Sequence, residues 1–192
     1  MTATLSPLAA WLPDIFDTTD SHDSTDTSVH VTPLRPLHVL ELARLTLDHP
    51  ELTGGSDLAT YVRTRRWAMH LVARRPHDTR AFLVTDVGRP VGVAVLDEIR
   101  RGSACSGRVS IWVHRGDRRR GIGSAAVERL GALAGDLGLR RLEAAVLPDD
   151  PAARGVLAAT GFVALGLSRG HRLVAGRWED HVLFERAVTS GG

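Results

Sequence analysis

Residues 109–123 join a strand pattern, a basic loop with two glycines and the start of a helix pattern, and this succession limits the folds open to the chain. Residues 109–114 alternate β-branched side chains with other residue types, which predicts a strand. From Ile122 to Leu137 apolar residues recur at spacings of 4, 4, 3 and 4, which predicts a helix. A strand, a glycine loop and a helix in this order are typical of sites that bind phosphate groups.

The loop before this helix has the chemistry of an anion site. Glycine has no Cβ, so Gly121 and Gly123 let the backbone adopt unusual torsion angles and approach a ligand closely. The first amides of a helix have no partner inside the helix, and the helix dipole adds partial positive charge beside them. We therefore predict a phosphate or pyrophosphate site. Its residues are Arg118, Arg119, Arg120, Gly121, Ile122, Gly123 and Ser124.

Two other interpretations of the loop stay open on spacing alone. One is an ordinary basic turn before a helix. The other is a dinucleotide-binding fingerprint, because residues 121–126 fit G-x-G-x-x-A and Glu143 follows Gly123 by 20 residues, where a ribose-binding acid belongs. That motif turns directly from strand to glycine, whereas six residues separate His114 from Gly121 here.

The composition fits a soluble domain of ordinary size with an appendage. The chain has 192 residues, of which 43% are hydrophobic and 24% are charged. No apolar run approaches the roughly 20 residues that span a bilayer, and no basic residue precedes the first apolar patch, so we expect no secretory signal. The single cysteine, Cys105, falls in a predicted loop and has no internal disulfide partner. These observations predict a cytoplasmic protein without membrane contact.

Residues 1–28 differ in charge from the rest of the chain. They contain five aspartates and no arginine, whereas the whole chain has a net charge of +2, so the remainder is basic. We predict an N-terminal arm that is flexible, or that packs Trp11, Ile15 and Phe16 on the domain or on a second subunit. A homodimer is therefore one alternative. The modest basic excess does not by itself indicate nucleic acid binding, and we predict no nucleic-acid partner.

Residues 29–188 are predicted to form one domain, followed by a tail at 189–192. Helices are expected at 36–48, 58–74, 122–138 and 150–161, the last with Asp150 as N-cap and Gly161 in the left-handed position that ends it. Strands are expected at 29–32, 81–85, 90–96, 109–113, 142–147, 162–167 and 181–188. Residues 86–89, Asp-Val-Gly-Arg, are predicted to form a hairpin turn.

The spacing Arg118-x-x-Gly121-x-Gly123 resembles the R/Q-x-x-G-x-G/A motif of the GCN5-related N-acetyltransferase (GNAT) superfamily. The predicted order of strands and helices over residues 28–188 is similar to that of its fold. The resemblance implies an α+β fold of three layers, with a mixed, mainly antiparallel sheet of six to seven strands. It also implies four helices on both faces and a V-shaped splay between the two central strands.

The residues from Gly161 onward look like one branch of that superfamily, the ribosomal-protein N-terminal alanine and polyamine acetyltransferases. In that branch a Gly-Phe strand leads to a hairpin that ends in Gly-x-Trp/Tyr-x-Asp, and residues 176–180 read Gly-Arg-Trp-Glu-Asp here. The resemblance implies acetyl-CoA as co-substrate and no metal. The backbone of Trp112 and Val113 would hold the pantetheine arm, the glycine loop would hold the pyrophosphate, and Asp150 takes the position of an asparagine at the start of the fourth helix.

The chain departs from the family pattern at two positions that carry acid–base chemistry in relatives. Leu157 stands where many relatives have a tyrosine that protonates the departing thiolate, and leucine has no proton to donate. The only tyrosine of the chain, Tyr61, lies on another predicted helix. Arg108 stands where many members of the branch have a glutamate.

Five residues are candidates for the base that deprotonates an acceptor amine: Asp97, Glu98, His114, Asp180 and His181. We predict Glu98, which follows a strand on the acceptor side, and His114, which follows the pantetheine strand and has a side chain suited to proton transfer near neutral pH. We expect Glu143 to be structural and to face a helix. Trp178 and Asp180 are expected to pack on and cap the last hairpin.

These expectations together predict an acetyl-CoA-dependent N-acetyltransferase. It would transfer an acetyl group by direct attack of a primary amine, either a small molecule or a protein N-terminus. The alternative is an acyl-CoA-binding sensor or partner module with little transfer activity, which Leu157 favours. A third hypothesis, nucleic acid binding through Arg115 and residues 118–120, lacks the interleaved aromatic residues that stacking requires.

Overall fold

The structure, a computed structural model, describes residues 28–47, 69, 72–73, 78–174 and 177–188. The predicted arm (1–28, apart from Ser28), the tail (189–192) and most of the predicted helix at 58–74 lie outside the described residues, as does Tyr61. The division of the chain into arm, domain and tail therefore stays a prediction.

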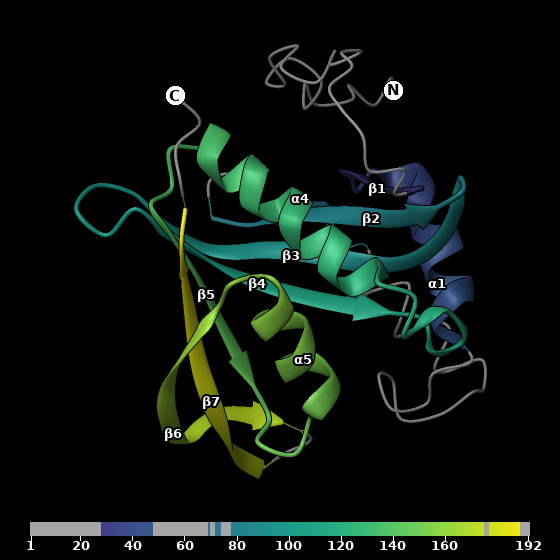
Figure 1. Cartoon of the computed structure of the whole chain (residues 1–192). Coiled ribbons are helices and arrows are strands. Elements are labelled where there is room, and N and C mark those ends of the chain that lie inside the picture. The colour runs from purple at the N-terminus through teal and green to yellow at the C-terminus, as the bar shows by residue number, and fades with distance from the viewer. Residues whose placement is uncertain (1–27, 48–68, 70–71, 74–77, 175–176, 189–192) are drawn as a thin grey trace, which may run out of the picture.

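Seven strands form a single sheet in the order β1-β2-β3-β4-β5-β7-β6 (Figure 1). Every neighbouring pair is antiparallel except β4 and β5, which are parallel. This is the mixed, mainly antiparallel sheet that was predicted, and its single parallel pair excludes the run of parallel strands that a dinucleotide-binding fold needs. The strands are β1 Val29–Pro33, β2 Arg80–Asp86, β3 Arg89–Arg100, β4 Ser106–Val113, β5 Arg141–Val146, β6 Val163–Val174 and β7 Arg177–Ala187.

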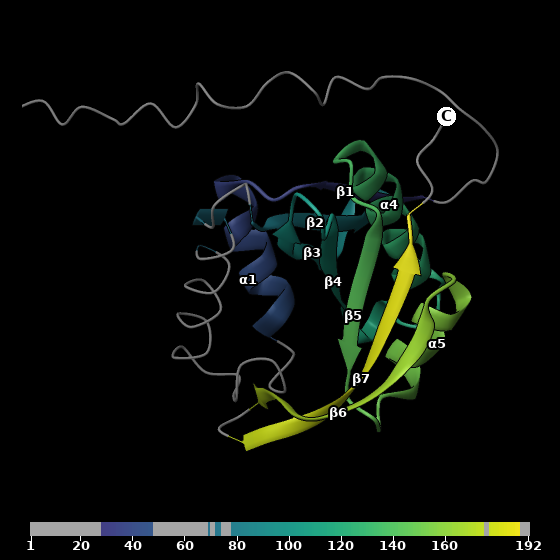
Figure 2. The ribbon, with the colours of Figure 1, turned by 90° about the vertical axis from the view of Figure 1, so that its left-hand side faces the viewer.

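Helices cover both faces of the sheet, as Figure 2 shows from the side. The helical elements are η2 Pro36–His38, α1 Val39–Leu47, η3 Arg115–Asp117, α4 Ile122–Asp136 and α5 Pro151–Ala159. Strand residues alternate between two buried clusters, because successive side chains of a strand point to opposite faces. Leu83 and Val93 pack with α1, whereas Val84 and Leu96 pack with α4 and α5.

Local signals predicted several turns and helix ends correctly. The β2–β3 turn has Val87 and Gly88 at φ 48° and 73°, the pair of positive angles that a two-residue hairpin turn of type I′ needs. Asp150 caps α5, since its Oδ1 accepts a hydrogen bond from the Ala153 amide at 2.9 Å. Gly161, at φ 76°, follows the end of the same helix in the left-handed region.

Four strands extend further than their apolar patterns predicted. β3 reaches Arg100 and β4 begins at Ser106, because the ladder continues through polar residues and a bulge between Asp97 and Arg100. β6 and β7 likewise continue as a long hairpin to Val174 and from Arg177. These extensions were not predicted because their charged side chains interrupt the alternation of apolar and polar residues from which a strand is predicted.

The two central strands separate after a short paired region, as the predicted V-shaped splay requires. β4 and β5 pair only where residues 106–108 face residues 141–143. Beyond the pair Arg108–Glu143, β5 continues beside β7, and β4 runs on beside β3 to Val113 (Figures 1 and 2). The edges of β4 and β5 that face one another are therefore open over the second half of each strand.

Candidate active site

The N-terminus of α4 presents backbone amides that find no acceptor among the described residues. Gly121 is the N-cap residue at φ 79°, in the left-handed region, and no side chain caps the helix. Its carbonyl accepts the Ala125 amide at 3.0 Å, whereas the amides of Ile122, Gly123 and Ser124 have no acceptor in the part of the chain that the structure describes. A Cβ on Gly121 would meet nothing within 4 Å. The helix end thus faces open space with its positive dipole end, as a phosphate site requires.

Gly123 brings α4 close to α5. A Cβ at this position would lie 3.2 Å from Cγ2 of Val156, so a larger residue would push the two helices apart. Asp150, at the start of α5, uses its carboxylate to cap its own helix. Its predicted contact with the cofactor stays a prediction.

Two of the three loop arginines bind the protein itself. Nε of Arg118 donates to the Val113 carbonyl at 3.0 Å. Arg120 pairs with Asp117 at 2.9 Å and with Asp86 at 2.7 Å. Arg119 adopts a positive φ of 63°. The buried carboxylates of Asp86 and Asp117 thus attract Arg120, and the predicted contact of the three arginines with a phosphate stays a prediction.

Asp117 is the centre of this ion-pair group. Its side chain is 5% exposed and pairs with Arg89 as well as with Arg120. The hydrogen bond from Arg89 lowers the pKa of the Asp117 carboxyl below its ordinary value, and the nearby positive charges act in the same direction against the effect of burial. Because Arg89 lies at the β2–β3 turn and Asp117 in η3, the group fixes the loop that leads to α4 against the sheet.

His114, one of the two predicted bases, starts η3. Its Nδ1 accepts the Gly116 amide at 3.2 Å and lies 3.4 Å from Oδ2 of Asp117. One ring nitrogen is therefore engaged in the turn that precedes the glycine loop. Its catalytic role stays a prediction.

The register of β4 decides which backbone groups face the open edge. The His114 amide donates to the Val91 carbonyl of β3 at 2.8 Å, and every second residue of a strand turns its peptide groups the same way. Trp112 therefore directs its backbone toward β3, and Ile111 and Val113 direct theirs toward β5. In this register Ile111 shares the open edge with Val113, and the predicted contact of Trp112 and Val113 with a pantetheine arm stays a prediction.

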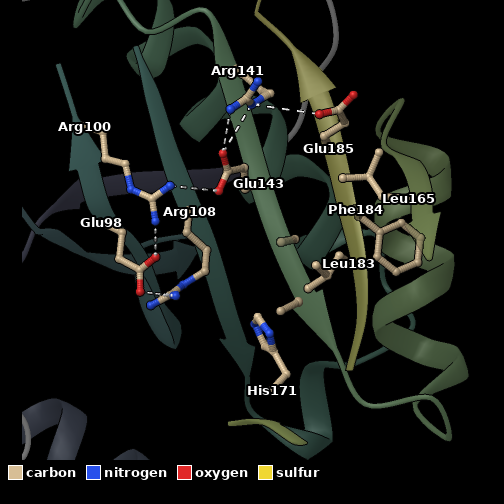
Figure 3. A pocket seen from close by; sticks show the side chains of 12 residues that line it. Glu98, Arg100, Arg108, Arg141, Glu143, Leu165, His171, Leu183, Phe184 and Glu185 are labelled. Atoms are coloured by element: carbon tan, nitrogen blue, oxygen red, sulfur yellow. Dashed lines mark hydrogen bonds and ion pairs between the residues drawn. The ribbon is translucent and has the colours of Figure 1, made fainter. Parts of the chain in front are cut away.

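A cleft of about 350 Å³ opens where β4 and β5 separate (Figure 3). It lies on the α1 face of the sheet, because Arg108 and Glu143 alternate in register with the residues that pack on α1. Its lining residues are Glu98, Arg100, Arg108, Arg141, Glu143, Ala144, Ala145, Leu165, His171, Leu183, Phe184 and Glu185. The cleft thus lies on the α1 face of the sheet, whereas α4 covers the opposite face.

A family model described as the acetyltransferase (GNAT) family matches residues 40–162, more than half of the chain. The chain belongs to this family. This match confirms the predicted superfamily and the predicted fold class. It also confirms the predicted enzyme class, an acetyl-CoA-dependent N-acetyltransferase. No curated protein matches the sequence significantly.

Solved structures of GNAT enzymes share this fold. RimJ of Mycobacterium smegmatis, in complex with CoA-disulfide, is 26% identical with a TM-score of 0.74, over 83% of this chain and 81% of that one. The ribosomal-protein-S5-alanine acetyltransferase of Vibrio fischeri is 22% identical with a TM-score of 0.72, over 88% and 97%. A spermidine N-acetyltransferase SpeG chimera from Vibrio cholerae and hSSAT is 17% identical with a TM-score of 0.67, over 84% and 96%.

The carboxylates of the GNAT cleft are held by arginines. Glu98 lies in the β3 bulge at φ 48° and pairs with Arg108 and, at 3.2 Å, with Arg100. Arg108 also pairs with Asp97 at 3.0 Å, and both of these side chains are largely buried. Glu98 therefore lines the cleft, but two guanidinium groups occupy its oxygens, and its role as base stays a prediction.

Glu143 was expected to face a helix, but among the described residues it faces the cleft. Its side chain lines the cleft and forms ion pairs with Arg141 at 3.1 Å and with Arg100 at 3.9 Å (Figure 3). The neighbouring Leu142 is fully buried on the opposite face, under α4. Since side chains alternate along β5, the helix-facing position belongs to Leu142 rather than to Glu143.

The β6–β7 hairpin contributes a residue that sequence patterns missed. The Asp180 carboxylate accepts the Gly170 amide at 2.8 Å, which confirms its role as a cap. Trp178 is 69% exposed, so its expected packing on the hairpin is wrong. His181 is buried, and its ring lies 5.4 Å from the ring of His171, which lines the cleft. His171 was missed because β6 was predicted to end at residue 167.

Leu157 is a core residue of this GNAT chain. It is 5% exposed and packs in the cluster beneath α4 and α5. Leucine has no proton to donate, so this position supplies packing rather than acid–base chemistry.

No helix within the described ranges has the length and apolar character needed to cross a membrane. In the same ranges, no group of three or more His, Cys, Asp or Glu side chains is arranged to hold a metal ion.

Proposed function

We propose that this GNAT enzyme transfers the acetyl group of acetyl-CoA to a primary amine, either a peptide N-terminus or a small molecule, which attacks the thioester directly. The diphosphate of CoA would bind the amides of residues 122–124 and the positive end of α4. The open backbone edge at Ile111 and Val113 would hold the pantetheine arm. A backbone amide on that edge would stabilise the developing oxyanion.

One observation carries the proposal: the cleft opens where β4 leaves β5, and β4 then leads from the cleft to the α4 N-terminus. The pairing of the strands stops at Arg108 and Glu143, the cleft opens at the same residues, and β4 leads through η3 to the α4 N-terminus. A thioester held along β4 would therefore reach the cleft from one face of the sheet while an amine enters from the other. Direct transfer needs this arrangement, because both substrates must be bound at once.

The acceptor class rests on the charges of the cleft. Three arginines, Arg100, Arg108 and Arg141, line it together with carboxylates that they neutralise. A substrate with several positive charges would meet these guanidinium groups, whereas one α-amino group needs only a single proton acceptor. An α-amine also has a pKa near 8, which makes its neutral form accessible at physiological pH. Relatives named for ribosomal-protein alanine acetylation support this choice.

Release of free CoA thiol tests the proposal. Acetyl-CoA would be offered with peptides that begin with alanine or serine, with spermidine and with aminoglycosides, and thiol would be measured colorimetrically. We expect release with at least one peptide, and thermal stabilisation by CoA that is lost in Gly121→Glu, since a carboxylate there repels a diphosphate. If the chain binds CoA but no amine in the panel releases thiol, the amine transfer is refuted.

The buried Leu157 favours a second function, a GNAT-fold acyl-CoA sensor with little transfer activity. Without a hydroxyl at that position, no side chain of α5 stands ready to protonate the thiolate. This function predicts tight CoA binding, a conformational response to acetyl-CoA and no thiol release. Thermal shifts with CoA and acetyl-CoA, read beside the thiol assay, separate it from catalysis.

The cellular location and a homodimer stay predictions. The absence of a nucleic-acid partner also stays a prediction. Arg118 and Arg120, which were considered for nucleic acid binding, bind groups of the protein.

A further inference from the structure

His171 enters the cleft from β6, opposite the arginines of β3 and β4. Its half-buried ring lies among the lining residues and points into the cleft (Figure 3). The backbone beside it is fixed, because Asp180 of β7 accepts the Gly170 amide at 2.8 Å. A side chain on a pinned hairpin can keep a defined position toward a substrate.

The carboxylates of the cleft are poor alternatives to this imidazole. Glu98 is paired with Arg108 and Arg100. Glu143 is paired with Arg141, and Glu185 lies 3.9 Å from the same arginine. Guanidinium groups thus occupy both oxygens of Glu98 and Oε1 of Glu143, which directs these oxygens toward the protein rather than toward a substrate.

The contacts that His171 makes with described residues leave one ring nitrogen for chemistry. Its Nδ1 lies 3.1 Å from Oγ of Ser168. With the proton on Nδ1, that atom donates to the hydroxyl, and Nε2 has a lone pair. The ring of His181 lies 5.4 Å away at an interplanar angle of 52°, with its own Nδ1 3.1 Å from the Glu179 carbonyl.

The surroundings of His171 disfavour its charged form. Burial lowers the pKa of the imidazole below its ordinary value, and His181 of β7, Arg172 of β6 and Arg108 of β4 lower it further. Glu98 of β3 acts in the opposite direction, and Glu143 of β5 also lines the cleft. These surroundings favour the neutral form of the ring, which is the state that a general base needs.

We propose that Nε2 of His171 is the base that takes a proton from the acceptor ammonium group. The step rests on the proposed acetyl transfer. One ammonium proton moves to Nε2, and the neutral amine attacks the thioester carbonyl. The N–C bond forms and the C–S bond breaks; the second amine proton leaves with the thiolate as CoA thiol, and the imidazolium releases its proton to solvent. One proton is released per acetyl group transferred.

His171→Asn tests the proposal, because the asparagine amide can replace the Nδ1 donor toward Ser168 but has nothing in the place of Nε2. With acetyl-CoA and the best amine of the panel, we expect kcat at pH 7 to fall about 100-fold or more, in the range of general-base catalysis, with KM for acetyl-CoA unchanged. The acidic limb of kcat, set by His171 below the ordinary histidine pKa, should disappear. Imidazole should restore activity to His171→Ala in proportion to its concentration.

The control is His30→Ala, at an exposed position of β1 on the opposite edge of the sheet; it should leave kcat and the pH profile unchanged. A structural role of His171 would raise KM or lower the melting temperature without rescue by imidazole. If His171→Asn keeps the wild-type acidic limb, or if imidazole rescues nothing, the base is refuted while acetyl transfer stands. A wild-type chain that releases no thiol with any amine refutes both.

Discussion

The conformation of Gly121 gives a quantitative test of the phosphate site. Gly121→Ala introduces a Cβ where φ is 79°, and a left-handed conformation costs an L-residue about 1–2 kcal/mol. The new Cβ meets nothing within 4 Å, so no contact offsets or increases this cost. Alanine also lowers the conformational entropy of the unfolded chain, which adds about 0.4–1 kcal/mol to the free energy of unfolding. We expect a net loss of about 1 kcal/mol of unfolding free energy, or about 2–4 °C in Tm for a domain of this size.

The same substitution should weaken CoA binding more than it weakens the fold. Relief of the strain turns the peptide before Ile122, so that the first amides of α4 no longer point at one place. Loss of one hydrogen bond to a charged phosphate costs about 1.5–3 kcal/mol, which corresponds to a 10- to 100-fold weaker Kd. Thermal melts with and without CoA, together with calorimetric titration, measure both effects.

Gly155→Ala is the matched control. Gly155 lies inside α5, and a Cβ there also meets nothing within 4 Å. Because its backbone is helical, alanine should raise stability by about 0.8–1 kcal/mol and leave CoA affinity unchanged. The reasoning is refuted if Gly121→Ala is as stable as the wild type and binds CoA equally well, or if both alanine variants shift stability in the same direction.

Two further predictions concern the side chains that support the site. Asp117→Asn should destabilise the fold by about 1–3 kcal/mol at pH 7, because it weakens charge-assisted hydrogen bonds from Arg89. The lowered pKa of Asp117 contributes stability above the ordinary aspartate pKa of about 3.9, and this contribution is lost as the pH falls through the folded value. Urea unfolding at pH 7 and near pH 3 should therefore show the difference shrinking in acid; a constant difference contradicts it. Leu157→Tyr should overpack the core, lower stability by about 1–3 kcal/mol and leave kcat no higher; a higher kcat in the thiol assay would show that the position reaches the thiolate.

Much of the fold could be predicted because its signals are local. The Asp150 cap depends on an amide three residues away, and the hairpin at Val87 and Gly88 depends on two adjacent residues. The glycine loop before α4 was recognised from the spacing of Arg118, Gly121 and Gly123 alone. Such features depend on neighbours within one turn of chain, so a single stretch of sequence contains all the information that they need.

The details of the site were less predictable, and each failure has a long-range cause. Arg120 was expected at a phosphate, but it pairs with Asp86, 34 residues earlier. Trp112 was expected at the open edge of β4, but its orientation depends on the hydrogen bond from His114 to Val91. Neither contact has a pattern in the sequence that fixes the partner.

The amino-acid order thus determined the Asp150 cap, the tight turn, the glycine loop before α4 and the membership of a fold family, since these follow from backbone preferences and from spacing along the chain. The packed sheet alone settled which charges neutralise one another in the cleft and that His171 stands across from Arg108. β6 and β4 both line this cleft only when the strands pair in this register. A shift of one residue would turn the side chain of His171 or of Arg108 to the other face of the sheet.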